Sequence, residues 1–399
     1  MDSRSNLRRQ HMITIQQDTL HAALNAVTRA SLKSSLMAAF SLVRLDANTN
    51  GLMHLSCFNG ETAARAAVNA DCNEDLSVCV DAITLKAVVE TLAGEVHLSV
   101  DQNSLILQGA STKTTLRIVD EPFPIIGEES IQTIAALSGV TFRSLARVLS
   151  FASTDDARAV LQVFHLMLDQ ESVTAQTADG YSAGHVRESI EGLTEPTSVS
   201  LPLSFARVLA TLVDDRDMVR LGTSGPNRYI FQITNEENAK DLTLATVTSA
   251  ENFPSAQIMT LVEDARKNTT AHLHVQQNSL MQSIRMVNAM GTQSTFIKAV
   301  NGVAKIASAE SETGQARNIL EGTASGEDTS IWLSAVFLKR AAEACKGELA
   351  IRIGGGQKPI LIEAGSFTAV IMPMLVEGNK DPFPEEEAIA VSLPEMATA

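Results

Sequence analysis

Three segments of the chain share one pattern of hydrophobic and polar residues: 84–109, 204–233 and 337–365. In each, apolar residues first recur every three or four positions, which predicts an amphipathic helix, and a Gly or Asp then ends it. Each segment continues with apolar residues at every second position, a turn and a second run of the same kind, which predicts two paired strands. The same unit of helix and strands is therefore expected three times.

The residues around these segments repeat as well. Each segment is preceded by another predicted helix with its strands and is followed by one further strand. The implied unit is an α+β domain in which two helices cover one face of an antiparallel sheet. The first helices are predicted at 19–32, 141–153 and 279–290, the strands after them at 53–58, 163–168 and 299–307, and the further strands at 114–119, 242–247 and 367–372.

The dipeptide Phe-Pro marks the same repeat. It begins at Phe123, Phe253 and Phe383, which are 130 residues apart in both cases. A repeat of this length indicates one structural unit used three times, and its size is typical of a domain. We therefore predict three domains, at 12–128, 129–259 and 260–377. Residues 1–11 are expected to be a leader or expression remnant, and residues 378–399 a flexible acidic tail.

The apolar stretch 367–376 begins as a strand and then meets Pro373. Because proline cannot donate a hydrogen bond to a sheet, the strand is expected to end there or to follow an edge. The residues from Ile371 to Val376 then remain as an exposed, methionine-rich patch, which is typical of an interaction site that adapts to different ligands. An ordinary core strand that ends at a proline fits the composition equally well.

The chain has a formal net charge of −15, so the molecule as a whole repels nucleic acid and anionic membranes. The predicted helices nevertheless carry basic residues, whereas the acidic residues crowd into loops and strands. If the helices of each domain face one side, that side can neutralise phosphates without reading base sequence. For any single helix, a solvated face is the simpler explanation. The basic helix residues are Arg29, Lys33, Lys86, Arg143, Arg147, Arg207, Arg285, Lys339 and Arg340.

Composition excludes several other classes of protein. Hydrophobic residues make up 45% of the chain and charged residues 19%, which is typical of a folded globular protein. Only 4% of residues are aromatic, which argues against a sugar-binding cleft or a platform that stacks single-stranded bases. The four cysteines show no zinc-site spacing, and no apolar run reaches the ~18 residues of a membrane span. We expect a cytoplasmic protein with reduced thiols and no membrane partner.

No pattern indicates an enzyme, a metal or a cofactor. His272 and His274 share one strand face, but no third ligand is evident. The adjacent aspartates at 155–156 and 214–215 are expected at helix ends or turns rather than as catalytic acids. The glycines at 354–356 lie between two predicted strands, which favours a hairpin turn over a phosphate-binding loop.

Together, the repeat, the Phe-Pro dipeptides and the Met-Pro-Met strand resemble the bacterial DNA polymerase III β subunit, the sliding clamp, over residues 12–376. The most specific matches are VIMPMLV at 370–376 and TADGYSAGHV at 177–186. Two others support them: SAENFPSAQIM at 249–259, and a helix followed by LQVFHLML from Leu161.

The resemblance implies the DNA-clamp fold, with three similar domains per chain and a head-to-tail homodimeric ring around duplex DNA. It also implies a replication role without catalysis, in which the ring slides on the DNA backbone. DNA polymerase and the clamp loader would insert short peptide motifs into a groove between the second and third domains. Carried over by position, that groove comprises Leu161, Ala178, Gly180, Tyr181, Ala183, Pro254, Ile258, Met259, Val370, Ile371, Met372, Pro373, Met374 and Leu375.

Several groove positions depart from the family pattern. Tyr181 to Ala183 stand where the family has His-Arg-Leu, Ile258 where a basic residue is common, and Leu375 where an arginine follows Met-Pro-Met. These changes predict an altered partner preference, as in a plasmid-type, phage-type or paralogous clamp. The alternative from another class is a three-domain protein-binding scaffold without a DNA function.

Overall fold

The computed structural model describes residues 12–124, 130–190, 196–249, 252–355, 358–376 and 381–383. The chain forms two compact units. Unit 1 comprises Met1–Thr177 and Val186–Phe253, and unit 2 comprises Ala178–His185 and Pro254–Ala399. The predicted leader, the boundary at 128/129 and most of the predicted tail lie outside the described residues. The predicted boundary at 259/260 falls inside the helix Ser255–Lys267. The division into three domains stays a prediction.

The first repeat contains two helices, and each helix is followed by several strands. Helix α1 buries Leu20, Leu24 and Val27, which lie three or four positions apart as the pattern predicted. Helix α2 begins where the Asp81 carboxylate accepts a hydrogen bond from the Thr84 N–H. The elements are β1 (Met12–Gln16), α1 (Gln17–Val27), β2 (Leu42–Asn48), β3 (Leu52–Phe58), β4 (Thr62–Asn69), β5 (Asp71–Cys72), β6 (Leu76–Asp81), α2 (Ala82–Glu90), β7 (Glu95–Asp101), β8 (Ser104–Gln108) and β9 (Lys113–Arg117).

The second repeat has the same order of elements, except that the short strand β5 has no counterpart among its described residues. Ser138 caps its first helix by accepting a hydrogen bond from the Thr141 N–H. That helix is shorter than predicted, because it ends at Ala146 and continues as the 3-10 turn Arg147–Phe151. The elements are β10 (Gln132–Ser138), α3 (Gly139–Ala146), β11 (Val163–Leu168), β12 (Ser172–Ala178), β13 (Ser182–Ser189), β14 (Thr197–Pro202), α4 (Leu203–Leu212), β15 (Met218–Thr223), β16 (Arg228–Asn235) and β17 (Lys240–Val247).

The third repeat adds a helix before its first strand. The strand predicted at 299–307 is wrong, because Asn301 and Gly302, both with positive φ, turn the chain there and divide it into a hairpin. The elements are α5 (Ser255–Lys267), β18 (Ala271–Gln276), α6 (Gln277–Ala289), β19 (Ser294–Val300), β20 (Val303–Ser308), β21 (Arg317–Ile319), β22 (Gly322–Gly326), β23 (Thr329–Ser334), α7 (Ala335–Glu343), β24 (Glu348–Ile353), β25 (Ile360–Ala364) and β26 (Phe367–Ile371).

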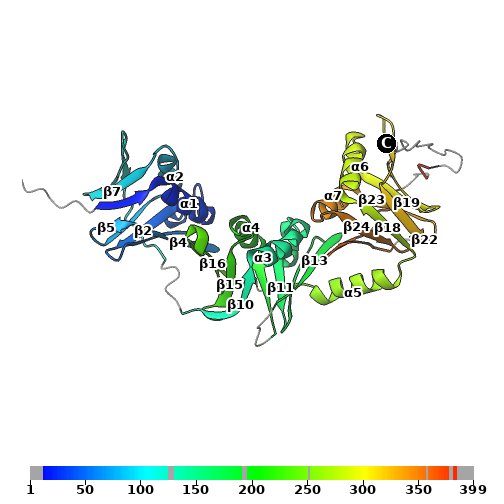
Figure 1. Cartoon of the computed structure of the whole chain (residues 1–399), viewed down its shortest axis with the longest axis horizontal. Coiled ribbons are helices and arrows are strands. Elements are labelled where there is room, and N and C mark those ends of the chain that lie inside the picture. The colour runs from blue at the N-terminus through cyan, green and yellow to red at the C-terminus, as the bar shows by residue number, and fades with distance from the viewer. Residues whose placement is uncertain are drawn as a thin grey trace, which may run out of the picture. The chain divides into compact units, whose positions relative to one another are not determined.

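Helix α5 was not predicted, because its sequence was interpreted only as the stretch around the second Phe-Pro dipeptide. Its buried residues Ile258, Val262 and Ala265 have helical spacing, which is the signal that was missed. The helix packs on β24 and β25, on the side of the sheet opposite α6 and α7 (Figure 1). The sheet of unit 2 is therefore covered on both faces.

A carboxylate fixes α5 to this sheet. Glu363 of β25 accepts hydrogen bonds from Arg266 of α5 at 2.8 Å and from Arg352 of β24 at 2.5 Å. Burial raises the pKa of Glu363, but the hydrogen bonds from the two arginines outweigh burial and hold the pKa below its usual value.

Pairing between strands follows one rule at both junctions between repeats. The last strand of the second repeat, β17, pairs with β4 of the first, and the last strand of the third, β26, is the neighbour of β13 of the second. The strand orders of the four sheets are β5-β1-β7-β8-β9, β10-β15-β16-β17-β4-β3-β2-β6, β14-β11-β12-β13-β26-β25-β24-β18-β22 and β21-β20-β19-β23.

A second repeated feature follows the last strand of each repeat. There the chain passes the strand that precedes the second helix and donates one backbone N–H to an equivalent carbonyl. These hydrogen bonds run from Val119 to Cys79 at 2.9 Å, from Ser249 to Ser200 at 2.9 Å and from Met374 to Trp332 at 2.8 Å. The three repeats are thus alike down to single contacts.

Candidate functional site

Residues 372–376, which we call the docking strip, follow β26. The strand ends at Ile371, two residues before Pro373, as the sequence predicted. Two backbone hydrogen bonds hold the strip: Met372 N–H donates to the Tyr181 carbonyl at 2.9 Å, and Met374 N–H donates to the Trp332 carbonyl at 2.8 Å. Leu375 is 79% exposed. The strip therefore presents apolar side chains from a fixed backbone.

The turn between β12 and β13 lies against the strip and is itself well ordered by local contacts. The Asp179 carboxylate accepts hydrogen bonds from the backbone N–H groups of Tyr181 and Ser182, at 2.9 and 2.7 Å. Gly180 has φ +92°, a conformation that favours glycine. Tyr181 is 54% exposed, and its ring stacks on Phe337 of α7 with 6.1 Å between the ring centroids.

Arg340 of α7 holds this turn in place. Its guanidinium pairs with Asp179 at 2.5 Å, donates to Ser182 Oγ at 3.2 Å and lies 5.3 Å from the ring centroid of Phe337. Arg340 was predicted to face DNA. Because its side chain is only 23% exposed and is paired here, the geometry favours a structural role beside the strip.

The structure divides the fourteen predicted groove residues by exposure. Five are buried and support the surface from below: Ala178, Ala183, Ile258, Val370 and Ile371. The expectation that Ile371 is exposed was wrong, because this last residue of β26 is fully buried and pairs with Ile360. Gly180, Tyr181 and Leu375 are exposed, and Leu161, Pro254, Met259, Met372, Pro373 and Met374 are half-buried.

Comparison with solved structures shows that the fold of the chain occurs in known proteins. A DNA polymerase III β subunit from Thermotoga maritima superposes with a TM-score of 0.81 at 16% identity, covering 92% of this chain and 100% of that one. A DNA polymerase sliding clamp from Bacillus subtilis gives 0.81 at 15% identity, with the same coverage. A putative β subunit from Eubacterium rectale gives 0.81 at 15%, covering 91% and 99%.

The chain has the sliding-clamp fold. No protein-family model and no curated protein sequence matches it. At this low identity, the likeness to a sliding clamp lies in the order and packing of the elements rather than in shared residues.

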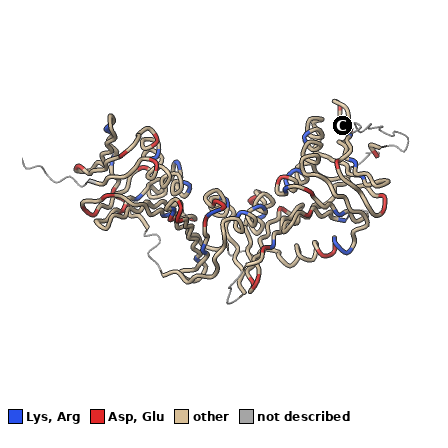
Figure 2. The backbone as a smooth tube through the Cα atoms, viewed as in Figure 1, with Lys and Arg blue, Asp and Glu red and all other residues tan. Residues whose placement is uncertain are grey.

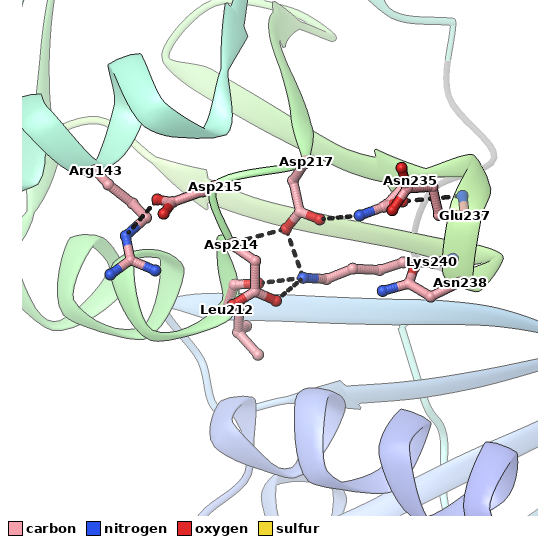
Figure 3. A network of polar contacts seen from close by, with 9 residues as sticks. All are labelled: Arg143, Leu212, Asp214, Asp215, Asp217, Asn235, Glu237, Asn238 and Lys240. Atoms are coloured by element: carbon pink, nitrogen blue, oxygen red, sulfur yellow. Dashed lines mark hydrogen bonds and ion pairs between the residues drawn. The ribbon is translucent and has the colours of Figure 1, made fainter.

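The predicted DNA-facing residues of this sliding-clamp fold differ in how they are engaged. Arg143 lies 3.2 Å from Asp215 (Figure 3), Lys339 lies 3.6 Å from Glu343, and Arg147 donates a hydrogen bond to the Ser144 carbonyl. Figure 2 shows acidic residues near the basic ones in both units, so the separation of charge by element is incomplete. Within the described part of the chain, no ion pair involves Arg29, Lys33, Lys86, Arg207 or Arg285.

A buried ion pair near α4 is structural. Lys240 Nζ donates to Asp217 at 2.6 Å and to the Leu212 carbonyl at 2.6 Å, and Asn235 donates to Asp217 at 3.0 Å (Figure 3). Burial raises the pKa of Asp217, but these hydrogen bonds and one from the Asp214 N–H outweigh it, so the pKa is below its usual value. The Asp217 N–H bonds the Asp214 carbonyl, so Asp214 serves in a turn, as predicted.

The remaining candidates also have structural contacts. Asp155 accepts a hydrogen bond from the Ala157 N–H, as expected for a residue at a helical turn. His272 Nδ1 contacts Arg352, and His274 Nδ1 lies 3.2 Å from Glu348. In the part of the chain that the structure describes, no three His, Cys, Asp or Glu are grouped to hold a metal ion. None of the described helices is long and apolar enough to cross a membrane.

Proposed function

We propose that the protein is a non-catalytic DNA sliding clamp. Two copies close head to tail around duplex DNA and tether a polymerase and other partners for processive synthesis. The observation that carries this proposal is the pairing rule between repeats.

The rule leaves one pair of complementary sheet edges. Strand β9 of the first repeat is equivalent by position to β17 and β26, which pair at the internal junctions. Strand β21 of the third repeat is equivalent to β4 and β13, the strands with which they pair. Among the described strands, β9 and β21 stand at the ends of their sheets. A second copy can supply both missing partners, which gives two equivalent junctions and a closed ring.

Two features account for the proposed contact with DNA: basic residues on the helices, which neutralise phosphates, and the closed ring, which surrounds the duplex. Arg29, Lys86, Arg207 and Arg285 lie on or directly after helices of both units. Each phosphate that such a residue neutralises makes binding more sensitive to salt, with a slope of about −0.9 in the log–log plot. Because the chain has a net charge of −15, we infer that the closed ring, rather than strong attraction, keeps the protein on DNA.

The docking strip and the neighbouring turn support the partner role. Burying about 300 Å² of apolar surface at about 25 cal/mol per Å² stabilises a complex by about 7 kcal/mol before ordering costs. The resulting affinity is modest, which suits partners that must exchange. Tyr181 and Leu375 then select a motif that favours apolar and aromatic contacts.

The test of encirclement uses linear duplex fixed to a bead at one end. The protein is allowed to thread onto the DNA, the free end is blocked with a bulky cap, and the beads are washed with high salt. A ring stays bound until a restriction enzyme cuts the DNA and then leaves. Light scattering gives the mass of the dimer in parallel. Loss of the protein in the salt wash, or a monomer, contradicts the clamp and favours the scaffold.

A charge reversal on each face of the sheet in unit 2 tests the DNA-facing side. Arg285→Glu on α6 is expected to reduce threading several-fold at low salt. Lys267→Glu on α5 is the matched control, because it makes the same charge change on the opposite face, and it should thread normally. Equal effects of the two variants would contradict the assignment of α6 to the DNA side.

The docking strip is tested by Met372→Ala combined with Met374→Ala. The double variant is expected to lose binding of a fluorescent peptide that carries a polymerase clamp-binding motif, while the mass of the dimer is unchanged. Met218→Ala in β15 removes an exposed methionine elsewhere and should bind the peptide normally. Unchanged affinity of the double variant would exclude this strip as the site.

A further inference from the structure

The four-stranded sheet of the third repeat carries an apolar row on the face away from α6. Phe296 of β19 lies directly opposite Ala307 of β20 and Trp332 of β23 in the strand register. The rings of Phe296 and Trp332 are 4.9 Å apart between centroids. Lys298 and Lys305, which are opposite each other, lie one step further along the same face. We call these five residues the apolar row and its two lysines.

A short segment of the chain's own tail occupies this row. Phe383 packs on Phe296, Ala307 and Trp332 and is 7% exposed. The tail was predicted to be flexible, and the structure instead fixes its residues 381–383 on the sheet. The contact lies beyond the docking strip, from which it is separated by residues 377–380.

The two lysines recognise the rest of the segment. Lys298 forms an ion pair with Asp381 and donates to the Phe383 carbonyl at 3.4 Å. Lys305 Nζ lies 5.4 Å from the centroid of the Phe383 ring. The Asp381 carboxylate also accepts the Phe383 N–H at 2.8 Å, which fixes the spacing between acid and ring. The surface therefore recognises an acidic residue, an aromatic ring two positions later and the backbone carbonyl of the aromatic residue.

The sheet forms this surface without help from the segment. The row consists of paired strand residues, and its lysines lie on neighbouring strands. The segment itself belongs to no helix or strand and contributes one ring and one ion pair. It therefore resembles a bound peptide that happens to be covalently attached.

We propose that the apolar row and its two lysines form a second peptide-binding site, for an extended segment with an acidic residue two positions before a phenylalanine. The tail occupies the site in cis, and a partner segment of the same chemistry displaces it. This site is separate from the docking strip and does not depend on encirclement of DNA. Trp332 connects the two, because its ring lies under Phe383 and its carbonyl holds Met374.

Trp332 is the only tryptophan of the chain, so tryptophan fluorescence reports on the ring that packs against Phe383. A chain that ends at Lys380 exposes the ring, and its emission is expected to shift to the red. Adding a synthetic peptide of residues 377–386, EGNKDPFPEE, should reverse the shift in a saturable manner. The same peptide with Ala for Phe383 should bind at least tenfold more weakly, and with Asn for Asp381 several-fold more weakly.

Competition by the tail gives a second measurement. A labelled copy of the peptide is expected to bind the shortened chain at least tenfold more tightly than the full chain. Phe383→Ala in the full chain should bind it as tightly as the shortened chain does, which keeps the test valid if shortening harms folding. Adding Lys298→Ala to that variant should weaken binding several-fold, and adding Lys267→Ala on α5 should have no effect.

Three results would overturn the proposal. One is the absence of saturable binding to a folded Phe383→Ala variant. Another is equal affinity of this variant and the unchanged chain. The third is peptide binding that is insensitive to loss of the phenylalanine, since a nonspecific apolar contact would then explain it.

Discussion

Phe253 in the second repeat and Phe383 in the third make the same contact in the two regions. Phe253 stacks on His165 with 5.0 Å between ring centroids, and Phe383 packs on Phe296. His165 and Phe296 are equivalent, because His165 pairs with Ser200 in its sheet and Phe296 pairs with Trp332. Ser200 and Trp332 in turn hold the chain through the repeated backbone hydrogen bond.

The two regions differ in how the phenylalanine is attached. Phe253 follows Ser249 by four residues and leads directly into α5, so the chain continues from it on both sides. Phe383 follows Met374 by nine residues, and none of the described helices or strands comes after it. The same aromatic contact can therefore be a fixed part of the fold in one repeat and a displaceable ligand in another. Which of the two it is depends on how the chain around the phenylalanine is connected to the fold, and not on the contact itself.

The largest expected change in the free energy of unfolding comes from replacing Phe253 or Phe383 by alanine. Phe253→Ala is expected to lower the free energy of unfolding by about 3–5 kcal/mol, because a cavity remains inside a continuous structure. Phe383→Ala should cost about 2 kcal/mol or less, because the tail simply detaches and the row becomes solvated. Urea unfolding measures both. Equal losses would contradict the distinction between fixed and displaceable contacts.

A smaller effect concerns the partner ring of Phe253. Burial lowers the pKa of His165, whose Nδ1 lies 2.9 Å from Ser200 Oγ. The unfolded chain therefore binds a proton at this site more readily than the folded chain. The contribution of His165 to the free energy of unfolding is complete above its ordinary pKa of 6.5 and is lost as the pH falls below that value.

His165→Phe gives the second repeat the ring pair of the third. Urea unfolding between pH 7 and 5 should show a weaker pH dependence in this variant than in the unchanged chain. Phe296→His makes the reverse exchange and should introduce the dependence into the third repeat. An identical pH profile for His165→Phe would show that the ring does not titrate in this range.

The smallest expected change in the free energy of unfolding comes from removing the charge of Lys298, which pairs with Asp381. Lys298→Ala removes the ion pair with Asp381 and should lower the free energy of unfolding by about 0.2–1 kcal/mol, as for other partly exposed pairs. Limited proteolysis should then cleave the tail faster than in the unchanged chain. Lys267→Ala on α5 is the control, and a cleavage rate equal to this control would show that Lys298 does not hold the tail.

Much of the fold could be predicted from local patterns. The apolar run VFHLML predicts a strand at Val163–Leu168, which the structure has at the same residues, and Pro373 predicts the end of β26 nearby. The glycines at 354–356 predict a turn between strands, and the two strands that flank them, β24 and β25, pair antiparallel. These features depend on residues close in sequence, so their signal is contained in short segments.

The contacts around the candidate site could not be predicted in this way. The pairing of Arg340 with Asp179 joins residues 161 positions apart, and the packing of Phe383 on Phe296 joins residues that are also far apart in the sequence. A basic residue on a helix face looks the same in sequence whether it meets a phosphate or a neighbouring carboxylate. Only the fold decides which group lies opposite it.

By itself, the sequence determined that one helix-and-strand unit occurs three times, because hydrophobic periodicity is set by the geometry of a single helix or strand. Tertiary structure alone decided which strands of neighbouring repeats pair, which described strands stand at the ends of their sheets, and that residues 381–383 lie on the third repeat. Those outcomes depend on which surfaces fit together in space, and no local pattern encodes the distance between them.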